Sequence, residues 1–141
     1  MINKITTNAM KKISYGKLNA RQKENYNFQK VSAVLADYGY CTLRLSDDWN
    51  GADFIAAHIN GHHSLRVQLK GRLTFDKKYL KNNIWVCFPY KSEWYFFPHD
   101  KLLGKLKKKM NFQNTESWNK GTFSWNSLSP EMLATLSEYK L

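Results

Sequence analysis

Hydrophobic residues in the first third of the chain recur at helical spacing. Intervals of three and four residues separate the apolar positions Phe28, Val31 and Leu35. Asn19 can cap a helix at its start, and Gln22, three residues further on, supplies a variant of the capping box. This pattern predicts an amphipathic helix over about residues 20–37, which ends before Gly39.

Strand patterns follow this helix. Over residues 40–46, apolar and polar positions alternate, which is typical of a half-buried strand. Residues 47–51 supply turn chemistry, and two further runs cover 52–59 and 64–70. The Asn60-Gly61 pair between these two runs is the strongest short signal for a β-hairpin.

The second half of the chain begins with a polar connector. After Gly71 we expect a short helix or an ordered loop, and then the continuously apolar run 84–88, which is typical of a central strand covered on both faces. A turn at 89–92 and another strand at 94–97 come next. Two helices follow the strands: a basic one from Pro98 to about Met110, and a terminal one with Ser129 as N-cap and Pro130 at its first position.

The order of these elements predicts an α/β fold in layers around one sheet. A chain of 141 residues is near the commonest size of a single domain. Within that domain, residues 1–18 are expected to form a basic N-terminal arm, residues 19–105 the core and residues 106–141 a C-terminal extension.

The charge of the chain points to a polyanionic partner. Lys and Arg number 22 against 11 Asp and Glu, a formal net charge of +11. We expect phosphate contacts from basic residues on the arm, the hairpin and the helix after the last strand: Lys11, Lys12, Arg66, Arg72, Lys105, Lys107, Lys108 and Lys109.

Membranes and disulfides are not expected to matter. No apolar run approaches the length of a membrane span, and the N-terminus lacks the apolar core of a secretory signal. The two cysteines, Cys41 and Cys87, each fall in a predicted strand, which fits the reducing cytosol. These features favour a soluble cytoplasmic protein.

The predicted hairpin gathers polar side chains on one face. A two-residue turn would place Asp53 opposite Gln68, whereas a four-residue loop would place it opposite Lys70. In either register Asp53, Arg66, Gln68 and Lys70 share a face, because side chains alternate with a period of two. The other face carries a core surface: Phe54, Ala56, Leu65, Val67 and Leu69.

These residue types suit metal-assisted hydrolysis of a phosphodiester. Asp53 offers a hard oxygen to Mg²⁺, which keeps several waters, and the Gln68 side-chain oxygen and the Leu69 carbonyl could complete the ligands. The metal would polarise the phosphate and lower the pKa of a bound water. Lys70 would orient that water, deprotonate it or balance the charge of the pentavalent state, and the sequence leaves these roles open. One helical interval before Phe28, Glu24 lies on or beside the apolar stripe.

These residues give the chain a resemblance to the PD-(D/E)XK, or restriction-endonuclease-like, superfamily. Ala52-Asp53 on one strand, Gln68-Leu69-Lys70 on the next and Glu24 on the preceding helix carry it. The glutamine of the Q-X-K variant is similar to that of certain intron-encoded homing endonucleases and some restriction enzymes. Two positions depart from the family pattern: Ala52 stands where proline is frequent, and Gln68 replaces an acid and removes one negative charge.

The resemblance implies a fold, an activity and a set of roles. The fold would be a three-layer core with a central mixed sheet in αβββαβ order, flanked by helices. The activity would be a Mg²⁺-dependent endonuclease, with Mn²⁺ as an alternative metal, acting mostly on DNA, duplex or branched. Asp53, Gln68 and Lys70 would form the active site, with Glu24 as an auxiliary acid and metal ligand. One such site cuts one strand, so double-strand cleavage calls for a homodimer or a higher oligomer.

Three alternatives stay open or are set aside. A basic nucleic-acid-binding module on the same fold would lack hydrolysis altogether. A ribonuclease would differ from the proposed enzyme only in its substrate. A zinc site at His58, His62 and His63 is disfavoured, because these residues fall on both faces of one hairpin and lack a fourth ligand.

Overall fold

The computed structural model describes residues 9–141. Residues 1–8 of the expected arm lie outside this range. The 3₁₀ helices are η2 (Tyr15–Lys17), η3 (Lys77–Tyr79) and η4 (Ser137–Tyr139). The α-helices are α1 (Ala20–Ala36), α2 (His99–Lys109), α3 (Glu116–Asn119) and α4 (Pro130–Leu136). The strands are β1 (Tyr40–Trp49), β2 (Ala52–His58), β3 (Ser64–Leu69), β4 (Thr74–Asp76), β5 (Ile84–Tyr90), β6 (Glu93–Pro98) and β7 (Thr122–Ser124).

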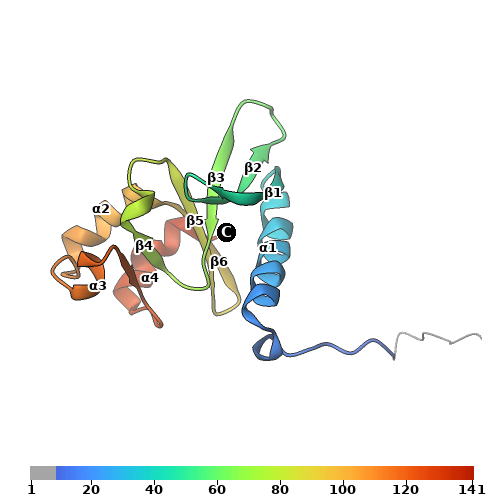
Figure 1. The fold of residues 1–141 in the computed structure, drawn as a ribbon, viewed down its shortest axis with the longest axis horizontal. Coiled ribbons are helices and arrows are strands. Elements are labelled where there is room, and N and C mark those ends of the chain that lie inside the picture. The colour runs from blue at the N-terminus through green and yellow to red at the C-terminus, as the bar shows by residue number, and fades with distance from the viewer. Residues whose placement is uncertain (1–8) are drawn as a thin grey trace, which may run out of the picture.

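A mixed five-stranded sheet forms the centre of the molecule (Figure 1). Its strands lie in the order β1-β2-β3-β5-β6, and all neighbours are antiparallel except β3 and β5, which run parallel. Strands β4 and β7 form a separate two-stranded sheet. The predicted mixed sheet flanked by helices is therefore confirmed. In the connector, where the resemblance implies a helix, the chain has only β4 and the single turn η3.

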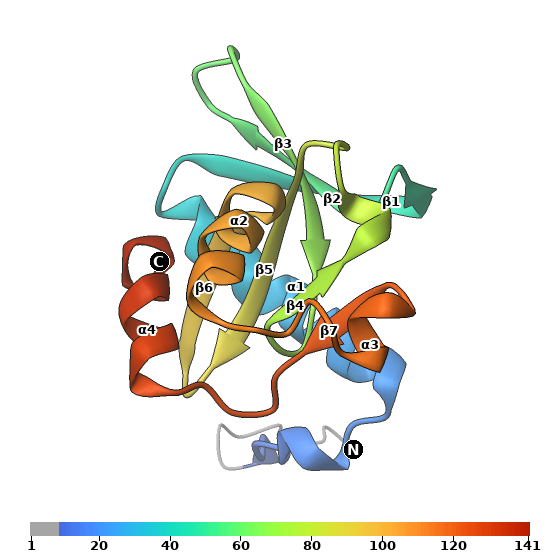
Figure 2. The ribbon, with the colours of Figure 1, turned by 90° about the vertical axis from the view of Figure 1, so that its left-hand side faces the viewer.

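Helices and the small sheet cover the two faces of the main sheet, giving three layers (Figures 1 and 2). Helix α1 packs on one face through a core of Val31, Leu35, Phe54, Ala56, Val67, Cys87 and Phe96. A second core lies where α2, α4 and the β4–β7 sheet meet β5 and β6. The segment 106–141 contributes buried residues to this second core: Leu106, Phe112, Trp118, Leu128, Met132 and Leu136.

Local signals fix helix α1. The Asn19 side chain accepts a hydrogen bond from the Gln22 N–H at 2.9 Å, and the Gln22 side chain accepts one from the Asn19 N–H at 2.9 Å. Both halves of the predicted capping box are present, so the orphan donors of the first turn are satisfied. The helix ends at Ala36, and Gly39 takes the left-handed conformation after it, with φ +85°.

Strand β1 is longer than expected and sets the shape of the site. The predicted turn at 47–51 is wrong in part, because β1 continues to Trp49 and the turn is formed by Asn50 and Gly51 with positive φ. The pairing of β1 with β2 is irregular between Arg44 and Trp49. Similarly, the expected turn at 89–92 is shorter, because β5 extends to Tyr90. The irregularity bends β1 beside the start of β2.

Candidate active site

Asp53 lies where β2 and β3 stop pairing through their backbones. The regular ladder runs from Ala57 opposite Ser64 to Phe54 opposite Val67. One residue further, the Asp53 side chain replaces the backbone as the partner of β3: its Oδ2 accepts a hydrogen bond from the Leu69 N–H at 2.9 Å. The carboxylate is thereby fixed against the backbone of β3.

Both backbone polar groups of Leu69, its N–H and its C=O, point toward the side on which Asp53 lies. In a strand, the N–H and C=O of one residue point to the same neighbour. On the opposite side, the Lys70 N–H donates to the Cys87 carbonyl of β5 at 2.9 Å. The Leu69 carbonyl therefore points to the β2 side, where Asp53 lies.

The observed register decides between the two alternatives for the hairpin. Continued by one residue beyond Phe54 and Val67, it places Asp53 opposite Gln68 and not opposite Lys70. Gln68 is half-buried and aligns with Val86 of β5. The backbone register therefore brings Asp53, Gln68 and Lys70 to the same end of the hairpin, but Gln68 lines neither of the hollows that hold Asp53 and Lys70.

Burial perturbs both titratable groups of this cluster. Burial raises the pKa of the Asp53 carboxyl, the Leu69 N–H opposes this shift, and the negative charge of Glu24 adds to it. Burial also lowers the pKa of the Lys70 ammonium, and the positive charge of Lys78 lowers it further. Among residues 9–141, Asp53 forms no ion pair within 4.0 Å, so its half-buried charge lacks a close counter-ion.

Two adjoining hollows give access to the cluster. The first, of about 470 Å³, lies between the start of α1 and the bend of β1, and its lining includes Glu24, Asp48 and Asp53. The second, of about 270 Å³, is lined by Leu69 and Lys70. Both share Ala20 and Glu24, so Glu24 stands between the side that holds Asp53 and the side that holds Lys70.

Glu24 occupies the position predicted for it on α1, but it has a partner that the sequence did not indicate. Its Oε1 pairs with Arg44 of β1 at 2.9 Å, and Arg44 also donates to Asn25. The side chain of Glu24 is 52% exposed. Glu24 therefore acts on Asp53 by its charge, from the rim of the hollow.

Tyr79 supports the cluster and was missed by the sequence analysis. It lies in the polar connector, where nothing in the local pattern marks it as buried, yet it is 1% exposed. Its ring lies 5.5 Å from the Lys70 Nζ and 5.3 Å from the Lys78 Nζ. Within residues 9–141, its hydroxyl has no hydrogen-bond partner. Burial raises the pKa of Tyr79, and the charges of Asp76, Asp53 and Asp48 raise it further.

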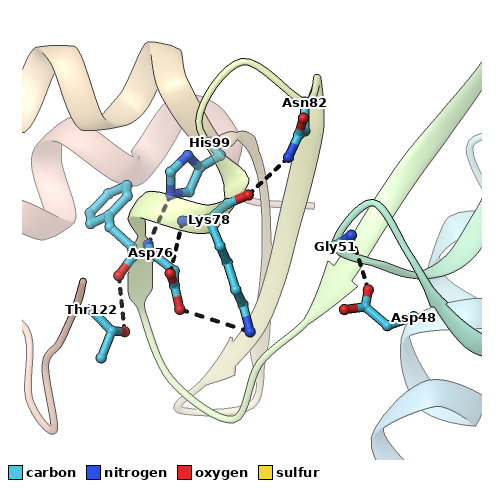
Figure 3. A network of polar contacts seen from close by, with 8 residues as sticks. Asp48, Gly51, Asp76, Lys78, Asn82, His99 and Thr122 are labelled. Atoms are coloured by element: carbon cyan, nitrogen blue, oxygen red, sulfur yellow. Dashed lines mark hydrogen bonds and ion pairs between the residues drawn. The ribbon is translucent and has the colours of Figure 1, made fainter. Parts of the chain in front are cut away.

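A buried histidine holds the connector in place beside the site (Figure 3). The Asp76 N–H donates to His99 Nε2 at 3.1 Å, so the neutral ring carries its hydrogen on Nδ1, which bonds Asp100 at 2.8 Å. Burial lowers the pKa of His99, and the hydrogen bond to Asp100 opposes this shift. Figure 3 shows the Lys78 side chain turned back toward the Asp76 carboxylate, with its Nζ 4.0 Å from Asp76 Oδ2.

The basic residues expected to contact phosphate differ in how free they are. Lys11, Lys12, Lys108 and Arg72 are exposed, although Arg72 bonds Asn126. Arg66 is half-buried, donates to the Asn82 carbonyl at 3.2 Å and stacks on Trp49. The remaining members on α2 also have partners within the chain: Lys105 pairs with Glu138, Lys107 lies over Trp118, and Lys109 donates to Thr135.

Comparison with solved structures gives distant likenesses, among them a junction resolvase and a homing endonuclease. No protein-family model matches the chain, and no curated protein matches it. The Holliday junction resolvase Hjc of Archaeoglobus fulgidus aligns with 55% of this chain and 74% of its own, at 16% identity and a TM-score of 0.44. The bacterial homing endonuclease I-Ssp6803I aligns with 86% of each chain, at 14% identity and a TM-score of 0.49. Both scores are below 0.5, so the description of the fold rests on the strands and helices above. In residues 9–141, no helix is long and apolar enough to cross a bilayer.

Proposed function

We propose that this chain is an endonuclease that hydrolyses phosphodiester bonds of DNA with a divalent cation, Mg²⁺ or Mn²⁺. The observation that carries the proposal is the Asp53 carboxylate, half-buried, fixed by the Leu69 N–H and adjoined by Lys70. A net charge of +11 supports a nucleic-acid substrate. The resemblance of the Asp53, Gln68 and Lys70 pattern to the restriction-endonuclease-like superfamily supports the same activity.

The donor set fits a hard cation. One oxygen of Asp53 remains beyond its bond to Leu69, and the Leu69 carbonyl and the Gln68 side-chain oxygen are further oxygen donors. Residues 9–141 contain no group of three His, Cys, Asp or Glu residues able to hold a metal ion. Mg²⁺ suits such a sparse set, because it keeps several waters and takes few protein ligands. When bound, the cation would polarise the phosphate and activate a water.

Three side chains would have separate roles in the reaction. Asp53 would hold its position against β3 while its free oxygen faces the hollow. Lys70 would donate hydrogen bonds to the attacked phosphate and offset the negative charge that grows in the transition state. Glu24 would act as an auxiliary acid at the rim of the hollow. It would leave Arg44 and bind the cation when the cation approaches.

Plasmid cleavage tests the proposal. Supercoiled plasmid should be nicked with Mg²⁺ and stay intact with EDTA. Asp53→Asn keeps the size of the side chain and an oxygen for the Leu69 N–H, so the fold should survive while cleavage is lost. Asp37→Asn, at the far end of α1, is the matched control and should cut like the wild type. Unchanged cutting by Asp53→Asn would refute the assignment of the site.

A non-hydrolytic binding module is the second candidate. The pairing of Glu24 with Arg44 and the amide at Gln68 favour it, because both reduce the negative charge available to a metal. Both candidates predict DNA binding that weakens steeply with salt. Only the endonuclease predicts cleavage that requires Mg²⁺, and an RNA of the same sequence, offered in parallel, tests the choice of substrate.

Double-strand cleavage calls for two sites, and we propose a two-fold dimer for that reaction. Sedimentation of the protein with a short palindromic duplex and Ca²⁺ measures the stoichiometry. We expect two chains per duplex, and one chain per duplex would contradict the dimer.

A further inference from the structure

A third hollow opens beside the candidate active site. It has a volume of about 520 Å³, and its lining includes Tyr15, Tyr26, Asn27, Lys30, Gly71 and Trp94. Three of these residues, Tyr15, Asn27 and Gly71, also line the hollow that contains Lys70. The two spaces therefore adjoin, and a polymer whose phosphate lies at Lys70 can extend into the third hollow.

Three aromatic residues, Tyr15, Tyr26 and Trp94, line this hollow. The rings of Tyr15 and Tyr26 lie 5.3 Å apart, and the two residues are 40% and 41% exposed. Trp94 is half-buried, lies opposite Pro89 in the β5–β6 pairing, and forms no aromatic pair with any ring of residues 9–141. Partly exposed tyrosine and tryptophan rings of this kind are platforms on which nucleobases stack.

The charges around these rings are positive. The Lys23 Nζ lies 5.4 Å from the centre of the Tyr15 ring, and the Lys30 Nζ lies 5.3 Å from the centre of the Tyr26 ring. Among residues 9–141, no Asp or Glu lines the hollow. Two cations beside stacking surfaces, without a carboxylate, suit a phosphate backbone with its bases and disfavour an acidic or purely apolar partner.

A hydrogen bond from a buried side chain holds part of this surface in place. Asn27 is 7% exposed, and its side-chain amide donates to the Tyr15 hydroxyl at 2.9 Å. This bond fixes η2 against α1 and holds the Tyr15 ring at the junction of the two hollows. The Tyr15 ring is therefore held at this position by a contact within the chain.

We propose that this hollow binds unpaired nucleotides next to the scissile phosphate. The preferred substrate class would then be a duplex that carries a single-stranded segment, such as a tail or a branch. The binding of a single strand stands on the hollow alone, whereas the substrate preference rests on the proposed nuclease activity.

Binding of labelled (dT)10 in EDTA, followed by fluorescence anisotropy, tests the hollow without any cleavage. Trp94→Leu keeps an apolar contact with the core on the α1 side and should weaken binding about tenfold. Trp94→Phe restores a ring and should recover most of the affinity. Trp49→Leu is the matched control, because Trp49 is a half-exposed tryptophan beside Arg66 that lines neither hollow. If circular dichroism shows that Trp94→Leu unfolds at a lower temperature than the wild type, Tyr26→Leu repeats the test on α1.

Equal affinity of the wild type, Trp94→Leu and Tyr26→Leu for (dT)10 would overturn the proposal. A second comparison uses Mg²⁺ and two duplexes, one blunt and one with a single-stranded tail. The wild type should cut the tailed duplex faster than the blunt one, and Trp94→Leu should cut the two duplexes at more nearly equal rates. If no duplex is cut, the nuclease proposal fails, and the (dT)10 measurement still decides the fate of the hollow.

Discussion

Gly51 is the position where one added methyl group should disturb the site most directly. Its φ is +89°, and a Cβ built on it would lie 2.9 Å from Tyr79 Cδ1. Gly61, in the β2–β3 connection, has a similar φ of +73°, but its Cβ would meet no atom within 4 Å. Gly51→Ala and Gly61→Ala therefore share the backbone strain and differ only in the contact with Tyr79.

The cost of each substitution follows from this difference. Alanine at a left-handed position costs about 1–2 kcal/mol in either variant. Alanine also lowers the conformational entropy of the unfolded chain, which stabilises both variants slightly. Because this gain is the same in both, it cancels in the comparison. At Gly51 the Tyr79 ring, fully buried, must also shift, and such overpacking typically costs about 1–3 kcal/mol. The free energy of unfolding should therefore fall by about 1–3 kcal/mol more in Gly51→Ala than in Gly61→Ala.

Urea unfolding followed by tryptophan fluorescence measures the two losses, with equal m-values as the condition for comparing them. Because Tyr79 lies beneath Lys70, Gly51→Ala should also slow cleavage by the protein that remains folded, whereas Gly61→Ala should not. Equal destabilisation of the two variants would show that Tyr79 does not obstruct a Cβ at position 51, and the account of how Lys70 is supported would be wrong.

Three further predictions concern charge. Gln68→Glu adds a carboxylate to the donor set, so the Mg²⁺ concentration for half-maximal cleavage should fall in a metal titration; a rise would exclude Gln68 as a ligand. Glu24→Gln removes a negative charge that raises the pKa of Asp53, so this pKa, followed by carboxyl NMR in the metal-free protein, should fall, and no change would place Glu24 too far away to act. His99 has a lowered pKa in the folded state, so the unfolded chain binds the proton more readily, and the free energy of unfolding should decrease as pH falls below about 6.5, by at most about 1.4 kcal/mol per pH unit. His99→Gln should flatten this dependence, and an equally steep curve in that variant would assign the effect to another group.

Local patterns were enough to predict the elements that carry the site. The capping box at Asn19 set the start of α1 within a residue, because its donors and acceptors lie three residues apart. Alternation in β2 and β3 assigned Asp53 and Gln68 to one face, since a strand has a side-chain period of two. The turn itself did not fix the register, and only the paired strands excluded the arrangement with Asp53 opposite Lys70.

Contacts between distant segments could not be predicted in this way. Tyr79 and Trp118 lie in polar stretches without periodicity, and both are buried by partners that are remote in sequence. The pair of Arg44 with Glu24 joins β1 to α1 across twenty positions, and no local spacing encodes it. The small β4–β7 sheet was missed for the same reason, because each of its strands has three residues.

The parallel pairing of β3 with β5 has a consequence for the order in which the molecule assembles. The β2–β3 hairpin closes over a short loop, but β5 can join only after residues 70–83 have been looped back, at an entropic cost that precedes any gain from pairing. The bond between the Lys70 N–H and the Cys87 carbonyl belongs to that later event. A refolding chain would thus hold Asp53 on a finished hairpin while Lys70 is still unanchored, and catalytic competence would be among the last properties that it regains.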